Sequence, residues 1–150
     1  MTPTLSRSLL MRVQFIRVAM LGLRARCALA AAAGAGAAGG RTLRVAARDA
    51  ARLGRERLPW ADAQARTVRA GLAAVRGRPV EAAGHLREAA GGFRACDMAL
   101  CAAAADLRLG ALLGGPDGDA LADRAGAWMA SQAVRRPDRV ADLFAPGFPR

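Results

Sequence analysis

The stretch LRLGALLGGPDG, Leu107 to Gly118, decides how the chain is interpreted, because it places four glycines directly after an apolar run. Glycines in such a segment either bring backbone N–H groups to a phosphate or let two helices approach each other closely. A phosphate-binding P-loop needs the pattern G-x-x-x-x-G-K-[ST] between a strand and a helix. The chain contains no lysine and no strand pattern. We therefore interpret these glycines as packing and turn residues.

Composition and periodicity predict an all-α protein. Ala, Leu and Arg, which are good helix formers, fill every segment, whereas β-branched residues are sparse and tyrosine is absent. Pro79 and Pro137 suit the first turn of a helix, where a missing N–H costs nothing. Prolines and glycines predict helix breaks at residues 34–40, 57–60, 76–79, 114–119 and 135–138, and the segment RACD (94–97) predicts a weaker break.

Three similar segments recur late in their predicted helices, and each is followed within a few residues by glycine. They are LRARCAL (23–29), VRAGLAA (68–74) and LRLGALL (107–113), and their starts are 45 and 39 residues apart. Periods of this size are typical of helical repeats with two helices per repeat. The sequence therefore predicts one tetratricopeptide-like array of about three antiparallel helix hairpins plus a short C-terminal capping helix, and we expect it to be a fragment of a longer array. The predicted hairpins are 5–57, 60–94 and 97–134, and the cap is 137–148.

Several residues are predicted to pack the repeats together. Gly71 and Gly110 occupy the same repeat position, where a missing side chain lets a neighbouring helix approach. Val80, Leu86 and Phe93 lie on one apolar stripe of their helix. We interpret the two tryptophans as packing residues, with a ligand-facing role as the alternative. The predicted packing set is Gly71, Gly110, Leu86, Phe93, Leu109, Leu113, Trp60, Trp128 and Met129.

The C-terminal stretch RRPDRVADLFAPGF, residues 135–148, predicts a short helix and a turn. Pro137 opens the helix, its apolar residues share one face, and Pro146 ends it. We expect a lid over the exposed end of the last hairpin that rests on Trp128 and Met129. The predicted cap residues are Pro137, Val140, Leu143, Phe144 and Phe148.

The charge distribution is uneven. The net charge is +11, all basic residues are arginines, and residues 1–48 contain no acidic residue. Arginine-rich helices attract phosphates, but no aromatic side chains are interleaved with these arginines, and no helix-turn-helix pattern is present. We therefore expect a protein or peptide partner rather than nucleic acid. A basic protein that binds nucleic acid, or a membrane surface through residues 5–33, stays open as an alternative.

The cysteines indicate neither a disulfide framework nor a metal site. Cys27, Cys96 and Cys101 are odd in number and lack C-x-x-C spacing. We expect small, buried, free thiols and a cytoplasmic location. The longest uncharged run, residues 27–40, is too short and too rich in Ala and Gly for a membrane span.

No residue pattern predicts an enzyme. Glu81, His85 and Glu88 share one helical face, but no second helix offers ligands to complete a metal shell. We therefore expect a solvated face. With one histidine and few serines, no nucleophile has a neighbouring base. We predict no catalytic residue, no metal and no cofactor.

Two regions resemble a known family. They are LPWADAQARTVRAGLAAVRG (58–77) and the segment from Met98 to Phe148, which contains W-M followed by P-x-R-x-A-x-x-x-A-P-G-F. Both are similar to the C-terminal helical-repeat region of large bacterial serine/threonine protein kinases. The kinase motifs themselves, including the Gly-rich loop, the β3 lysine, H-R-D and D-F-G, are absent from this sequence.

The resemblance implies a non-catalytic interaction or regulatory module of a bacterial signalling protein. The alternative is the regulatory tail of a serine/threonine kinase polypeptide. Because the first predicted helix is apolar and lacks acidic residues, we also expect the chain to self-associate.

Overall fold

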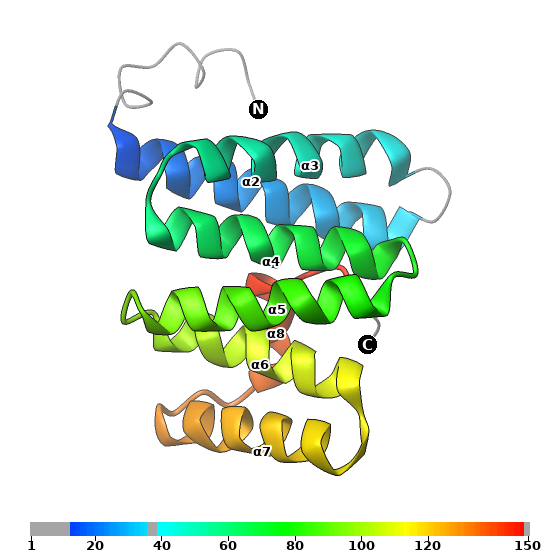
Figure 1. Ribbon diagram of the computed structural model, residues 1–150, viewed down its shortest axis with the longest axis vertical. Coiled ribbons are helices and arrows are strands. Elements are labelled where there is room, and N and C mark those ends of the chain that lie inside the picture. The colour runs from blue at the N-terminus through cyan, green and yellow to red at the C-terminus, as the bar shows by residue number, and fades with distance from the viewer. Residues whose placement is uncertain (1–12, 36–38, 149–150) are drawn as a thin grey trace.

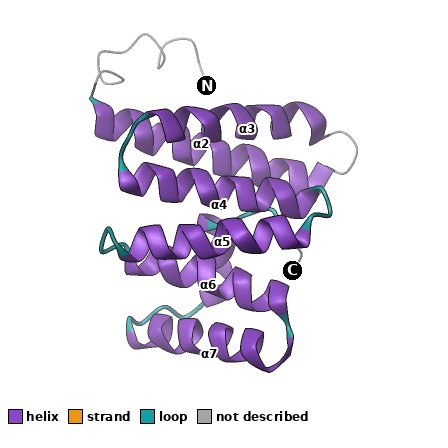
Figure 2. Ribbon diagram, in the orientation of Figure 1, coloured by secondary structure: helices purple, strands orange, loops and turns teal. Residues whose placement is uncertain are grey.

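The computed structural model describes residues 13–35 and 39–148, and every regular element in these ranges is an α-helix (Figure 2). The all-α prediction is thus confirmed. The start of the first predicted hairpin, residues 5–12, lies outside the described residues. The helices are α2 (Gln14–Ala35), α3 (Gly40–Arg55), α4 (Pro59–Val75), α5 (Pro79–Arg94), α6 (Ala99–Leu113), α7 (Gly115–Ser131) and α8 (Pro137–Phe144).

Local sequence explains where the helices begin and end. Proline stands in the first turn of α4, α5, α7 and α8, where its missing N–H would be unpaired in any case. Gly77 and Gly114 follow α4 and α6 with φ angles of 71° and 61°, which only glycine adopts without strain. Asp97 takes a φ of 56° in the turn before α6. Helix boundaries fall at or beside each predicted break. The predicted turn 114–119 is corrected, because only Gly114 lies between α6 and α7, whereas Gly115 and Gly118 belong to α7.

Consecutive helices pack side by side in a single stack (Figure 1). Helix α3 lies at one end of the stack and α7 at the other, and α8 lies behind the middle helices. We call the surface formed by α2, α4 and α6, the first helix of each consecutive pair, the inner face. α8 contacts α6 and α7, and a hydrogen bond joins its Leu143 to α2.

Small residues bring the helices close together. A buried cluster between α2, α3 and α4 consists mainly of alanine and leucine, and most of α6 is buried. At the contact of α6 with α7, a Cβ atom at Gly110 would lie 2.5 Å from the carbonyl oxygen of Gly118. Only glycine fits such a backbone contact.

Ion pairs join the first two helices. Asp49 of α3 is fully buried and accepts hydrogen bonds from both Nε and Nη2 of Arg24 of α2. Glu56 follows α3 and accepts 2.6 Å hydrogen bonds from Arg17 of α2. The second pair lowers the pKa of Glu56. Both acidic groups therefore point toward α2 rather than toward solvent.

Six of the predicted packing residues are buried, namely Leu86, Phe93, Leu109, Met129, Gly71 and Gly110. Three apolar side chains differ from the prediction. Val80 is 86% exposed, Leu113 is 44% exposed and Leu143 is 58% exposed. Val80 and Leu113 stand at the ends of α5 and α6, where no neighbouring helix covers them, and Leu143 lies on the side of α8 that faces solvent. The periodicity identified the apolar face of each helix, but it did not show which residues of that face are left uncovered by a neighbouring helix.

Candidate functional site

The C-terminal segment, residues 137–148, lies on the inner face rather than over the end of the last hairpin. Val140 and Phe144 do pack against the cluster that contains Met129 and Trp128. The segment also contacts α2 through Leu143 and Phe144, α4 through Pro146 and α6 through Phe148. Its residues Ala141, Ala145 and Pro146 are buried. The predicted lid is therefore corrected to a strap that crosses three helices.

Arg108 of α6 holds the middle of this segment. Its Nη2 forms an ion pair with Asp142, and its Nε donates a hydrogen bond of 3.3 Å to the carbonyl oxygen of Ala145. Its guanidinium carbon also lies 5.8 Å from the centre of the Phe148 ring. One side chain thus recognises a carboxylate, a backbone carbonyl and an aromatic ring, which are the three partners that suit a planar guanidinium.

Arg26 of α2 contacts the same segment at Leu143 and Phe144. Its Nη1 donates a hydrogen bond of 3.3 Å to the carbonyl oxygen of Leu143, and its guanidinium lies 5.2 Å from the centre of the Phe144 ring. Burial lowers the pKa of Arg26, but a guanidinium remains charged in proteins. The C-terminal segment is therefore bound by arginines from two different hairpins.

The end of the segment packs directly against Gly71 of α4. A Cβ atom at this position would collide with the carbonyl oxygen of Pro146 and with the side chain of Leu29. Gly147 passes over the same spot with a φ of 99°, a conformation that favours glycine. The glycine that the repeat pattern singled out thus accommodates the strap as well as a neighbouring helix.

The chain bends back onto the inner face through the residues between α7 and α8. Ala133 has a φ of 60°, which turns the backbone sharply after α7. The carboxylate and the two aromatic rings of the segment then find their partners on α2 and α6. These partners explain why the segment crosses the inner face instead of remaining at the last hairpin.

Beyond the strap, the inner face is hollowed. A cavity of about 410 Å³ lies between the first turns of α2 and α4 and the turn before α6. The rings of Phe15 and Trp60 lie 5.6 Å apart along one side of it. A smaller cavity of about 60 Å³ shares Arg26, Gln64 and Met98 with it and reaches Phe144 of the strap. The larger cavity is lined by Phe15, Ala19, Arg26, Trp60, Gln64, Cys96 and Met98.

This hollow combines apolar contact area with hydrogen-bond donors. Aromatic and methionine side chains offer apolar contact area, while Gln64 and Arg26 supply N–H donors for backbone carbonyls. The predicted packing residue Trp60 therefore has two roles, since it contacts the core cluster of α2, α3 and α4 and also lines the cavity.

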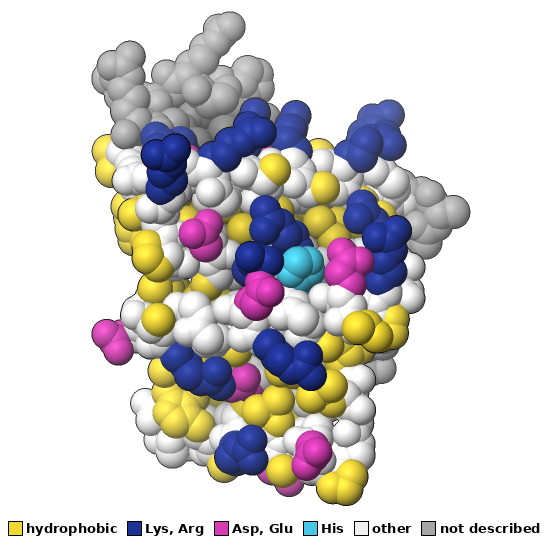
Figure 3. Space-filling model, in the orientation of Figure 1, with side chains coloured by type: hydrophobic (Ala, Val, Ile, Leu, Met, Phe, Trp, Pro, Cys, Tyr) yellow, Lys and Arg dark blue, Asp and Glu magenta, His cyan; other side chains and the backbone are white. Residues whose placement is uncertain are grey.

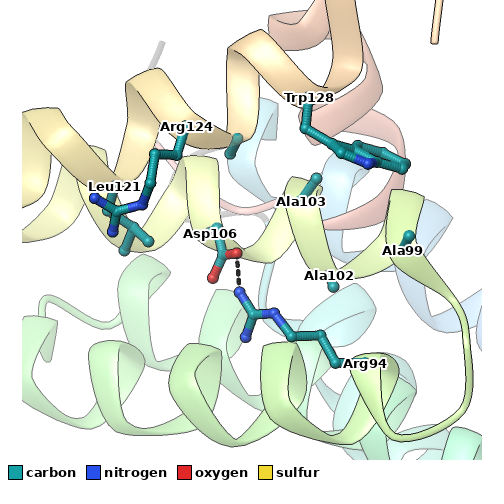
Figure 4. A pocket seen from close by; sticks show the side chains of 9 residues that line it. Arg94, Ala99, Ala102, Ala103, Asp106, Leu121, Arg124 and Trp128 are labelled. Carbon is teal, nitrogen blue, oxygen red and sulfur yellow. Dashed lines mark hydrogen bonds and ion pairs between the residues drawn. The ribbon is translucent and has the colours of Figure 1, made fainter. Parts of the chain in front are cut away.

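Trp128 lines a separate cavity of about 270 Å³ between α6, α7 and the end of α5 (Figure 4). Arg94 and Asp106 form an ion pair across it, and Arg124 extends from α7 on one side. The ion pair satisfies the only acidic group that lines this cavity. Each tryptophan is thus half-buried, with one part on the core and one on a cavity.

His85 lies on a charged surface that faces away from the strap (Figure 3). Its Nε2 is 3.9 Å from Glu81, and Arg66 of α4 forms an ion pair of 2.5 Å with Glu88. Burial and the nearby charge of Arg66 lower the pKa of His85. Within the described residues, no group of His, Cys, Asp and Glu side chains is arranged to hold a metal ion.

The three cysteines are free and differ in exposure. Cys101 is buried, and burial raises the pKa of its thiol. Cys96 is half-buried, whereas Cys27 is exposed, which corrects the prediction of three buried thiols.

No protein-family model matches the chain, and no curated protein and no solved structure shows significant similarity to it. Among the described residues, no helix has both the length and the apolar character to cross a membrane.

The sequence did not single out the two arginines that bind the strap. Arg108 stands at the aliphatic-Arg position that recurs in all three repeats, but the equivalent Arg24 binds Asp49 instead. Arg26 occupies the repeat position that Gly71 and Gly110 hold elsewhere. That departure from the repeat is the one local signal of a special role.

Proposed function

We propose that this protein is a non-catalytic interaction and regulatory module of a bacterial signalling protein, built as a tetratricopeptide-like array, and that its inner face binds a short segment of a partner protein. The observation that carries the proposal is the C-terminal segment itself. It is a short helix with a following turn, bound across three helices by Arg26, Arg108 and Gly71. A surface that binds one such segment has the shape and the donors to bind another.

The recognition chemistry is that of a helix in a groove, in which apolar side chains anchor the ligand and charged groups fix its direction. The strap supplies two phenylalanines and one aspartate to the inner face. The open cavity beside it adds room for a further apolar side chain next to Trp60. The expected partner segment is therefore short, helical, aromatic and acidic.

The place in signalling rests on the resemblance of the C-terminal motif to bacterial kinase tails. Of the motif residues, Ala141, Ala145, Pro146, Gly147 and Phe148 pack against the array, whereas Arg139 is exposed. Val140, Asp142 and Phe144, which lie between motif positions, contact the array as well. We infer that the motif marks a strap docked on its own array. A regulatory tail of a kinase polypeptide would use the same face in the same way.

Site-specific photocrosslinking in the native cells tests the proposal. Benzoylphenylalanine at Ala19, an exposed residue that lines the cavity, should give a discrete crosslinked partner. The same group at Ala120, an exposed alanine of α7, is the matched control and should give none. Adding Trp60→Ala to the Ala19 variant should remove the crosslink. Equal crosslinking from both positions, or none from Ala19, would contradict a binding role for the inner face.

A further inference from the structure

Five arginines form a straight row along the outside of α3. Arg41, Arg44, Arg48, Arg52 and Arg55 are all exposed. At 3.6 residues per turn they fall within an arc of about 80°, and they extend over about 21 Å of the helix. We call these five residues the α3 arginine row. Figure 3 shows dark-blue side chains projecting along the top edge of the molecule, where Figure 1 places α3.

The positive charge of the row is not neutralised by its own helix. The acidic residues of this region, Asp49 and Glu56, are bound by Arg24 and Arg17 of α2. Within residues 13–35 and 39–148, no carboxylate forms an ion pair with an arginine of the row. Neighbouring guanidinium groups on one helix face repel each other. An anionic partner would relieve this repulsion along the whole row.

We propose that the α3 arginine row docks the protein on an anionic lipid bilayer. The row is straight, and α3 lies at the end of the stack, so a flat surface meets all five side chains at once. A DNA strand completes a turn of its duplex in about 34–36 Å, so over the length of the row it would wind more than half-way round its axis. Single strands are bound through aromatic side chains, and α3 has none.

The lipid surface also fits the end of the row. Val13 is 50% exposed, and the neighbouring Gln14 donates a hydrogen bond of 2.8 Å to the carbonyl oxygen of Glu56, directly after Arg55. Val13, an exposed apolar residue, therefore adjoins in the chain a residue that contacts the end of α3. The apolar face of α3 itself is buried, with Ala46, Ala50 and Leu53 in the core. The helix thus adsorbs through charge and does not insert.

Vesicle sedimentation with the full chain tests this surface. The probes are vesicles of phosphatidylcholine alone, which carry no net charge, and vesicles of phosphatidylcholine with about 30% phosphatidylglycerol, which are anionic. Each arginine near an anionic surface contributes about five-fold in affinity. The variant Arg44→Gln, Arg48→Gln, Arg52→Gln should bind the anionic vesicles roughly 100-fold more weakly than the natural chain. The matched control Arg76→Gln, Arg87→Gln, Arg135→Gln removes the same charge from exposed arginines elsewhere and should bind within a few-fold of the natural chain.

Circular dichroism of both variants verifies that each remains folded, since all six side chains are exposed. Binding should vanish in about 1 M salt, where charges are screened within a few ångströms. Equal losses in the two triple variants would overturn the proposal, because they would show a response to net charge alone. Absence of binding to anionic vesicles would overturn it as well. Row-dependent binding to duplex DNA without vesicle binding would replace the lipid surface by a nucleic acid.

Discussion

Asp49 is a fully buried carboxylate whose charge is matched by Arg24. Asp49→Ala should lower the free energy of unfolding by about 3–5 kcal/mol, because it leaves the Arg24 charge in a partly buried site without its partner. Urea denaturation followed by circular dichroism measures the change. Asp138→Ala is the control, since Asp138 pairs with Arg136 in full solvent, and such surface pairs contribute little. Similar losses in both variants would contradict the interpretation of Asp49.

Gly71 and Gly84 form a matched pair for testing the strap contact. Gly71→Ala places a methyl group against the carbonyl oxygen of Pro146 and against Leu29, whereas Gly84→Ala meets nothing within 4 Å. Gly84→Ala should raise the free energy of unfolding by about 0.5–1 kcal/mol, because alanine favours the helix. Gly71→Ala should lower it and should loosen residues 145–148. Thermal melts would contradict the placement of the strap if both variants were stabilised alike.

His85 makes stability depend on pH. Its pKa is lowered in the folded protein by burial and by the charge of Arg66, so the unfolded chain binds a proton more readily. The free energy of unfolding should therefore fall as pH decreases through the unfolded value near 6.5, until the lowered folded pKa is passed. His85→Gln should flatten this dependence. Urea midpoints at about pH 7.5 and 5.5 test it, and identical slopes in both proteins would exclude the effect.

At the scale of elements, Arg108 determines how firmly the C-terminal segment is held. Arg108→Ala removes an ion pair, a backbone hydrogen bond and a ring contact. Hydrogen bonds to charged groups contribute about 1.5–3 kcal/mol, so residues 137–148 should open far more often. Hydrogen exchange of these amides should speed up by roughly ten- to a hundred-fold. Arg139→Ala is the control, since Arg139 is an exposed residue of α8 itself. In this variant the amides of residues 137–148 should exchange at the same rates as in the natural chain. Equal exchange in the two variants would exclude Arg108 as the clamp.

The helices were predictable because their signals are local. Pro59, Pro79 and Pro137 begin helices. Gly77 and Gly114 occupy the positions after helices where the backbone needs a positive φ. The path of the strap was not predictable. Its partners come from helices about 35 to 120 residues away in the chain, and no periodicity within a helix specifies such distant contacts.

The same limit applies to the candidate site. Apart from the repeat position of Arg26, its arginines differ from other arginines of the chain only in what surrounds them after folding. Trp60 and Trp128 stood out in the sequence as packing residues, and each also lines a cavity that the sequence did not predict. The predicted packing glycines Gly71 and Gly110 lie at close backbone contacts, because the absence of a side chain is itself a local property.

For the whole molecule, the stack separates two surfaces. The inner face carries the strap and the open cavity, and the end helix α3 carries the arginine row. Self-association stays a prediction, and the exposed side chains of Val13, Phe15 and Leu23 on and beside α2 are where we expect it. A partner segment on the inner face would compete with the strap but not with the arginine row.

The central claim is that the inner face is a binding site for a short segment and that the C-terminal segment occupies it. The most direct test loosens the strap from its own side, with Asp142→Ala and Phe144→Ala in the full chain, and measures the anisotropy of a fluorescent peptide of residues 135–150. The peptide should bind this variant and should bind the natural chain at least ten-fold more weakly, because the natural strap competes for the site. A Leu143→Ala peptide should bind as well as the natural one, since Leu143 faces solvent, whereas a peptide with Asp142→Ala and Phe144→Ala should not bind. Failure of the natural peptide to bind the folded variant, or equal binding of all three peptides, would contradict the account.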